Sequence, residues 1–208
     1  IQRQLVAQLP NITLVKNPVN LTTPKLLGWP EGHTLKMAMV GYVGNAKGHD
    51  TALDALSGNE WKARDWELNI YGKGYAESYV QDLANFYQIR KKVFLKGFTN
   101  NIQDVWTHNH LLLVPSAGEG LPLILVEAML CGRPAVVTDV GGNTELITEG
   151  HTGFVADAPS VRSFGQALER MWQQRETLGK MGKAAFSVAK NFYPQKPERM
   201  LLKKMINI

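Results

Sequence analysis

The chain of 208 residues is long enough for one large domain or two small ones, with a sizeable hydrophobic core. Its hydrophobic fraction of 44% is ordinary for a globular protein, and its longest apolar runs, residues 111–115 and 121–126, are too short to cross a bilayer. A net charge of +5 favours anionic partners such as nucleotides and phosphates, and the single Cys131 excludes an intramolecular disulfide.

Six apolar segments, each bounded by glycine, proline or polar residues, predict β-strands. They are residues 35–40, 67–71, 93–95, 111–114, 134–138 and 153–156. Helical segments are expected between and after them, at residues 50–56, 75–87, 102–106, from Pro122 through Glu127, near Glu145, and at 161–174, 176–190 and 198–206. Residues 12–16 are either a further strand or part of an interdomain connection. The alternation predicts an α/β fold, with a parallel sheet of about six strands and helices on both faces.

Glycines follow five of the predicted strands, at Gly41 and Gly44, Gly72 and Gly74, Gly97, Gly118 and Gly120, and Gly141 and Gly142. In a parallel sheet, ligands bind outside the carboxyl ends of the strands, where these loops lie. One glycine at a turn usually means only a positive φ angle, but five such loops at one edge predict close approach of the backbone to a ligand. Lys47, taken alone, is an ordinary surface lysine, but beside this edge it is a candidate point charge for a phosphate.

Residues 115–129 place two carboxylates eight positions apart, Glu119 in a glycine-rich loop and Glu127 inside an apolar run. Pro122 is expected at the first helical position, so that the amides of residues 120–123 form a helix N-terminus, which is a natural anion site. Glu127 then falls on the second turn with apolar residues on both sides. Because a carboxylate in such surroundings is unfavourable unless it is hydrogen-bonded, we expect a ligand to be its partner.

Other ligand-binding motifs do not fit the chain. In residues 41–48 the lysine precedes the last glycine and no Ser or Thr follows, unlike a nucleoside-triphosphate loop. The second strand ends in Tyr71-Gly72-Lys73, without the acid of the dinucleotide fingerprint. The five histidines and Cys131 have no zinc-like spacing, and the sequence contains no Asp-x-Asp pair to hold a metal at a diphosphate. We therefore expect no metal.

In their order along the chain, these motifs resemble a known family. The segment from Glu119 to Glu127 is similar to the E-x7-E signature of the retaining glycosyltransferases of family 4, the "group 1" transferases with a GT-B fold. The resemblance covers almost the whole chain, through residues 17–20, 40–50, 72–74, 93–97, 115–116, 132–134, 141–145 and 153. It implies a Rossmann-like, donor-binding domain, the C-terminal half of a GT-B fold. We assign this domain to residues 21–190, an interdomain connection and first elements to 1–20, and a C-terminal helix to 191–208.

The resemblance also implies roles for individual residues. Glu127 would accept hydrogen bonds from the two ribose hydroxyls of a nucleoside diphosphate sugar, and Glu119 would bind sugar hydroxyls near the reacting carbon. Lys47 would add positive charge as the diphosphate leaves, when negative charge grows. The other donor-binding residues that it implies are Gly41 and Tyr42 after the first strand, Gly97 and Phe98 beside the base, and Gly120, Leu121, Pro122 and Leu123 at the distal phosphate.

One position departs from the family. An arginine usually follows the first-strand glycine, whereas this chain has Tyr42. A phenol donates one hydrogen bond but carries no charge. Either another cation such as Lys73 or Lys96 substitutes, or the N-terminal domain supplies one, or the activity is altered.

We therefore expect a hexosyl-type retaining glycosyltransferase domain that binds a nucleoside diphosphate sugar of UDP or GDP type and needs no cofactor. The chain begins at Ile1 without a signal-peptide pattern, so we expect a cytoplasmic fragment of a longer protein, inactive alone, whose N-terminal domain binds the acceptor. The positive charge suggests peripheral contact with the inner membrane surface, and no nucleic acid partner is expected. The alternatives are a non-hydrolysing nucleotide-sugar epimerase, for which Glu119 alone supplies few acid–base groups, and a non-catalytic nucleotide-sugar-binding module, which Tyr42 favours.

Overall fold

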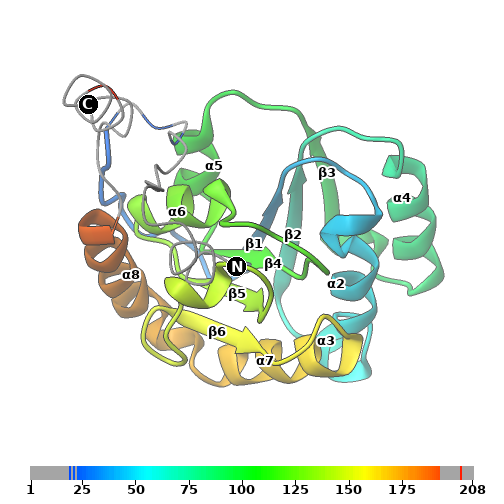
Figure 1. The fold of residues 1–208 in the computed structure, drawn as a ribbon. Helices are drawn as coiled ribbons and strands as arrows, with labels where there is room; N and C mark the ends of the chain where they lie inside the picture. Colours follow the sequence, from blue (N-terminus) through cyan, green and yellow to red (C-terminus); the bar gives the residue numbers. More distant parts are fainter. Residues whose placement is uncertain (1–18, 20, 22, 193–201, 203–208) are drawn as a thin grey trace.

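The computed structural model describes residues 19, 21, 23–192 and 202 (Figure 1). Six parallel strands form one sheet in the order β3-β2-β1-β4-β5-β6. The strands are β1 (Leu35–Val40), β2 (Trp66–Tyr71), β3 (Val93–Gly97), β4 (Leu111–Val114), β5 (Ala135–Thr138) and β6 (Gly153–Ala156). The predicted α/β, Rossmann-like fold with a six-stranded parallel sheet is confirmed.

Helices cover both faces of the sheet, because side chains alternate between the faces along each strand. In β1, Met37 and Met39 belong to one hydrophobic core and Ala38, between them, to the other. The first core is closed by α2 (His49–Ala55), α4 (Glu77–Phe86) and α7 (Val161–Gln173). The second is closed by α5 (Ile102–His108), α6 (Leu123–Leu130) and α8 (Leu178–Phe192), which lie on the other side of the sheet in Figure 1. None of the described helices is long and apolar enough to span a membrane.

The predicted elements are present with boundaries shifted by a few residues. The short helix expected near Glu145 is the 3-10 turn η3 (Asn143–Glu145). The structure adds α3 (Asn59–Ala63), whose Trp61 is buried in the first core, and the 3-10 turns η1 (Asn45–Lys47), η2 (Arg90–Lys92) and η4 (Arg175–Thr177). The helix that holds Glu127 begins at Leu123, so Pro122 is its N-cap. The prediction that Pro122 is the first helical residue was wrong by one position. The expected strand at residues 12–16 and the helix at 198–206 lie outside the described residues, apart from Leu202. The domain boundaries at residues 20 and 190 stay predictions.

The strand registers bring the predicted ligand loops together. Val40, the last residue of β1, lies beside Tyr71 at the end of β2, and Tyr71 lies beside Gly97 at the end of β3. On the other side of β1, Val114 at the end of β4 pairs with Val137. Because the strands are parallel and end level with one another, the loops that follow β1 to β5 share one edge of the sheet.

His110, before β4, predicts a pH dependence of stability. Its Nδ1 accepts a hydrogen bond from the backbone N–H of Lys36, 3.0 Å, and its Nε2 is 3.3 Å from the carbonyl oxygen of Pro30, which suits the neutral ring with its proton on Nε2. Burial lowers the pKa of His110 below its ordinary value of 6.5. As the pH falls through about 6.5, His110 therefore becomes protonated in the unfolded chain but stays neutral in the folded chain, and the free energy of unfolding falls. We expect a loss approaching 1.4 kcal/mol per pH unit between pH 6.5 and the lowered pKa.

Urea unfolding at pH 7.5 and pH 5.5 measures this slope. His110→Gln should flatten it, whereas His33→Gln, at an exposed histidine, should leave it unchanged. Part of the slope should persist in His110→Gln, because burial also lowers the pKa of His49. Equal slopes in the wild type and both variants would contradict the assignment.

Candidate functional site

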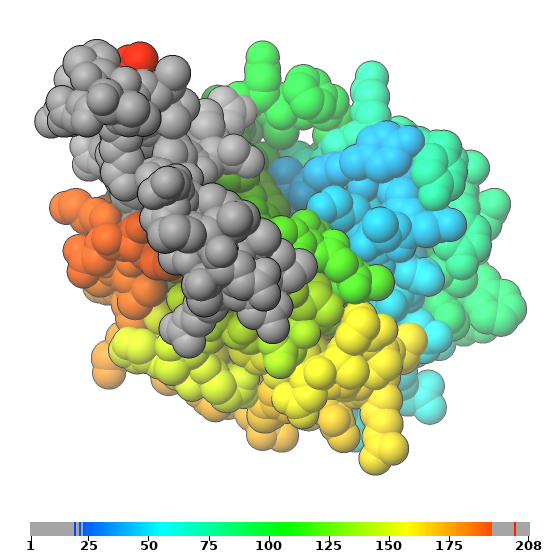
Figure 2. All heavy atoms as spheres, viewed as in Figure 1, coloured from blue at the N-terminus to red at the C-terminus, as the bar shows by residue number. Residues whose placement is uncertain are grey.

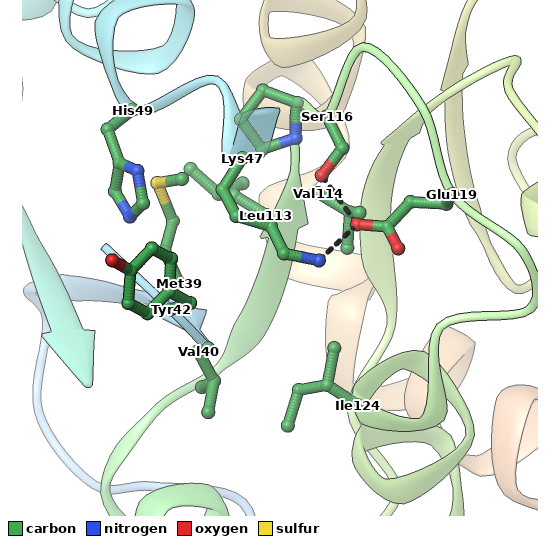
Figure 3. Close-up of a pocket in the computed structure, with 12 residues that line it drawn as sticks. Met39, Val40, Tyr42, Lys47, His49, Leu113, Val114, Ser116, Glu119 and Ile124 are labelled. Atoms are coloured by element: carbon green, nitrogen blue, oxygen red, sulfur yellow. Dashed lines mark hydrogen bonds and ion pairs between the residues drawn. The ribbon is translucent and has the colours of Figure 1, made fainter. Parts of the chain in front are cut away.

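The loops after β1 and β4 bring together Lys47 and Glu119, which are 72 positions apart in the sequence. Lys47 Nζ is 2.6 Å from Glu119 Oε1, and Ser116 Oγ donates a hydrogen bond of 2.8 Å to the same oxygen (Figure 3). The side chain of Glu119 is only 10% exposed, and that of Lys47 is 37% exposed. The two residues expected to act on the sugar and the leaving group thus form an ion pair at the carboxyl edge of the sheet.

The local chain path explains this contact. Lys47 ends η1, and Gly48, with φ of +68°, turns the chain directly into α2. The amide of Ala117 donates to the carbonyl oxygen of Ala46, 3.3 Å, which joins the two loops. Ser116 is fixed in turn, because its carbonyl oxygen accepts a buried hydrogen bond of 2.7 Å from Thr138 Oγ1. In Figure 2 the blue surface that follows β1 borders the green surface that follows β4.

A first hollow lies around this ion pair, lined by Gly41, Tyr42, His49, Ser116 and Ile124 in addition to Lys47 and Glu119. His49 is buried, and this burial lowers the pKa of its ring, so the imidazole is neutral at neutral pH. Charge in the lining therefore comes from Lys47 and Glu119, which compensate one another.

A second hollow of about 320 Å³ adjoins the first and shares Val40, Gly41 and Tyr42 with it. The rest of its lining comes from the ends of β2 and β3 and consists of Tyr71, Gly72, Lys73, Phe98 and Thr99. Phe98 is 72% exposed, which leaves its ring available to a flat apolar group. Tyr42, between the two hollows, is also exposed and packs against Tyr75 with 6.0 Å between ring centroids.

The beginning of α6 faces the first hollow through Ile124, on its first turn. Pro122, as N-cap, has no side-chain donor or acceptor for the helix end. Among the residues that the structure describes, none accepts a hydrogen bond from the amides of Gly120, Leu121 or Leu123. These N–H groups at a helix N-terminus suit an anion.

Glu127 lies on the second turn of α6, as predicted, and is only 6% exposed. It lines neither hollow. Glu127 already has an interaction within the chain, so its burial does not by itself require a ligand, and the ligand expected from the sequence stays a prediction. Its role at the ribose stays a prediction.

Two of the glycines in the loops at this edge have a packing role that the sequence did not indicate. A Cβ atom added to Gly72 would clash with the carbonyl oxygen of Gly41, and one added to Gly141 would clash with that of Glu119. At these two positions the packing of neighbouring loops by itself requires glycine. Gly97, Gly118 and Gly120, by contrast, have open space where a Cβ would lie.

Replacing Gly141 by Ala should therefore displace the Glu119 loop. Gly141 has φ of +58°, in the left-handed region, and its Cβ would meet backbone atoms that cannot rotate away. We expect a loss of about 2 kcal/mol in the free energy of unfolding, which urea titration measures. Gly118→Ala is the matched control, since its Cβ would enter open space, and it should change stability by less than about 0.5 kcal/mol. Equal stability of the two variants would contradict the loop-packing role.

Sequence reasoning did not assign four of the polar side chains that line the site, those of Ser116, His49, Tyr71 and Thr99. Ser116 is three positions before Glu119 and His49 two positions after Lys47, so their closeness in the sequence to these predicted site residues could have indicated them. Tyr71 and Thr99 line the second hollow because β2 and β3 end side by side, and no local sequence pattern indicates this strand pairing. Within the described part of the chain, no group of three or more His, Cys, Asp and Glu residues is placed to hold a metal ion.

Taken together, the fold and this edge define a doubly wound α/β domain with a lysine–carboxylate pair at the carboxyl ends of its strands. The family model "Glycosyl transferases group 1" matches residues 29–188, and the chain belongs to this family.

Curated relatives include a glycosyltransferase of Haemophilus influenzae, 29% identical over 160 residues, which are 76% of this chain and 45% of that protein. The alpha-D-kanosaminyltransferase of Streptomyces kanamyceticus is 28% identical over 148 residues, 70% of this chain and 38% of that protein. The chain thus spans less than half the length of these relatives.

Solved structures of GT-B glycosyltransferases share the fold. A TarM mutant of S. aureus, crystallised with fondaparinux, alpha-GlcNAc-glycerol and UDP, superposes with a TM-score of 0.79 at 20% identity, over 99% of this chain and 41% of that chain. The pneumococcal O-GlcNAc transferase GtfA in complex with UDP and GlcNAc gives a TM-score of 0.77 at 19% identity, over 89% of this chain and 38% of that chain.

Proposed function

We propose that the chain is the donor-binding, C-terminal half of a retaining glycosyltransferase, and that it binds a nucleoside diphosphate sugar at the Lys47–Glu119 edge. The observation that carries this proposal is the 2.6 Å contact between Lys47 and Glu119, which places a cation and a carboxylate where the strands end. Structural neighbours with UDP in their crystals favour UDP as the nucleotide.

Different parts of the site suit different parts of the donor. The second hollow, with the exposed ring of Phe98, suits the base, which stacks on an apolar face. The amides of Gly120, Leu121 and Leu123 at the start of α6 suit the distal phosphate. The first hollow holds only about 20 Å³, so the sugar lies at its mouth, where Glu119 and Ser116 offer polar atoms to its hydroxyls.

In the reaction, Glu119 holds the sugar near its anomeric carbon and Lys47 compensates the charge that grows on the leaving diphosphate. Both groups must exchange their mutual contact for contacts with the donor. A cation already positioned at the leaving group needs little reorganisation in the transition state. The acceptor is held by an N-terminal domain of the same parent protein, so this chain alone binds donor weakly and transfers little.

Among the residues that the structure describes, Glu119 is the one carboxylate that lines either hollow. An epimerase needs a base and an acid on the sugar, so this lining favours transfer. Cytoplasmic location, peripheral membrane contact and independence of metal stay predictions.

Calorimetric titration of the chain with UDP, GDP, dTDP and ADP tests the proposal. We expect saturable binding of one of them, weakened at least tenfold in Glu127→Gln, because a charged acceptor makes the stronger hydrogen bonds to the ribose. Glu176→Gln, at an exposed glutamate on η4, is the control and should bind as the wild type does. Binding to none of the four nucleotides, by a folded sample, would contradict the proposal.

A further inference from the structure

The donor edge contains two hollows with different charge. Both are lined by Gly41 and Tyr42, so an extended anion such as a diphosphate would contact both. In the first hollow, Lys47 and Glu119 are 2.6 Å apart and their charges cancel. In the second hollow, Lys73 is the one charged residue among the described residues of the lining.

The charge of Lys73 is not compensated nearby. Within the described part of the chain, its ammonium group makes no ion pair and no hydrogen bond, and the residue is exposed. Its backbone is nevertheless fixed, because its carbonyl oxygen accepts a hydrogen bond of 3.1 Å from the amide of Val43 in the β1 loop. Lys73 thus presents a free cation from a loop that is anchored to the loop carrying Tyr42 and Lys47.

Lys96 is the natural comparison, since it is an exposed lysine on the neighbouring strand β3. Its ammonium nitrogen lies 5.1 Å from the ring centroid of Phe94, and it lines a different hollow, with Lys36, Glu67 and Asp104. That hollow contains neither Gly41 nor Tyr42. That hollow shares Tyr71 and Thr99 with the second hollow, so Lys96 carries the same charge close to the donor edge but away from Gly41 and Tyr42.

We propose that Lys73 is the cation that binds the diphosphate of the donor in the ground state, whereas Lys47 acts mainly in the transfer step, after Glu119 has turned to the sugar. This inference rests on the proposed function, because it assigns parts of the same site. It divides two roles between two lysines, so that affinity for a nucleoside diphosphate depends on Lys73 and turnover depends on Lys47.

The division predicts an unusual result for the ion pair. The double variant Lys47→Met, Glu119→Gln removes both charges and leaves the net charge of the first hollow unchanged. It should bind UDP within about threefold of the wild type. Glu119→Gln alone frees Lys47 for the phosphates and should bind UDP more tightly than the wild type. Lys73→Met should bind UDP roughly tenfold more weakly, as the loss of a charge-assisted contact implies.

Calorimetric titration with UDP at 50 mM and 500 mM NaCl measures these differences. Lys96→Met is the matched control, with the same change of charge, and should stay within about twofold of the wild type. Salt should weaken binding by the wild type and by Lys96→Met more than binding by Lys73→Met. Salt screens the contact between Lys73 and the diphosphate, and Lys73→Met lacks this contact. A merely structural role of Lys73 would not change this salt dependence.

The outcomes separate the two proposals. If the wild type binds UDP and Lys73→Met binds it as well as Lys96→Met does, the role of Lys73 is overturned and the donor site stands. If the double variant loses UDP binding, Lys47 is a ground-state ligand and the division of roles is overturned. If no nucleoside diphosphate binds to the wild type, both proposals fail.

Discussion

Replacing Glu119 by Gln is expected to reduce sugar transfer by the full-length parent protein about a hundred- to a thousandfold, the range found when one preorganised polar group of an active site is removed. Glu119 is largely buried, holds Lys47 at 2.6 Å and accepts a hydrogen bond from Ser116. The amide keeps the shape of the side chain but loses the charge that pairs with Lys47 and that, in the proposed function, holds the sugar. Nucleotide binding should survive, because the base and the phosphates have other partners.

Initial rates of transfer, with KM and kcat separated, measure this effect. Glu149→Gln is the matched control, since Glu149 also pairs with a cation at 2.6 Å, Arg170, but at the surface. It should change the rate by less than twofold. Transfer by Glu119→Gln within twofold of the wild type would show that Glu119 is not part of the catalytic site.

Replacing Arg133 by Met should have the largest effect on stability, a loss of about 3 kcal/mol in the free energy of unfolding. Arg133 is 1% exposed, and its guanidinium donates to four backbone carbonyl oxygens, of Gly28, Trp106, Asn109 and Gly132, at 2.6–3.2 Å. Burial lowers its pKa to about 10, which still leaves it charged at neutral pH. Methionine fills similar space but leaves these carbonyl oxygens without their donor. Removing the buried charge offsets part of that loss, because the desolvation of the guanidinium is no longer needed.

Urea unfolding at pH 7 measures the change. Arg162→Met, at an exposed arginine near the start of α7, is the control and should stay within about 0.5 kcal/mol of the wild type. An Arg133→Met protein as stable as this control would show that other groups hold the segment around Gly28 in place.

The sheet could be predicted from the sequence because its signals are local. Each strand is a short apolar run, and β1, β4 and β6 begin and end where the pattern indicated. Helix α3, with only five residues, is too short to show a helical period, and Trp61 packs by tertiary contact. The start of α6 was misplaced by one residue, because Pro122 fits a helix N-cap as well as a first turn.

The site was predictable only in part. The contact between Lys47 and Glu119 follows from the rule that loops at the carboxyl ends of parallel strands meet. The purpose of the glycines does not follow, because a glycine forced by a neighbouring loop looks in the sequence like a glycine that makes room for a ligand. The network of Arg133 was equally hidden, since its partner at Gly28 is 105 positions away and is a backbone carbonyl that any residue could supply.

The most direct test of the account is a ¹⁵N NMR titration of the chain with UDP and with its sugar conjugates. We expect the shifts to concentrate on the amides of Gly41, Tyr42, Lys73 and residues 97–99, 118–121, 123 and 124, at the carboxyl edge of the sheet. The amides of residues 32–35, at the opposite edge, should not move. Shifts that concentrate at that opposite edge, or no saturable shift with any nucleoside diphosphate, would contradict the assignment of the donor site to the Lys47–Glu119 edge.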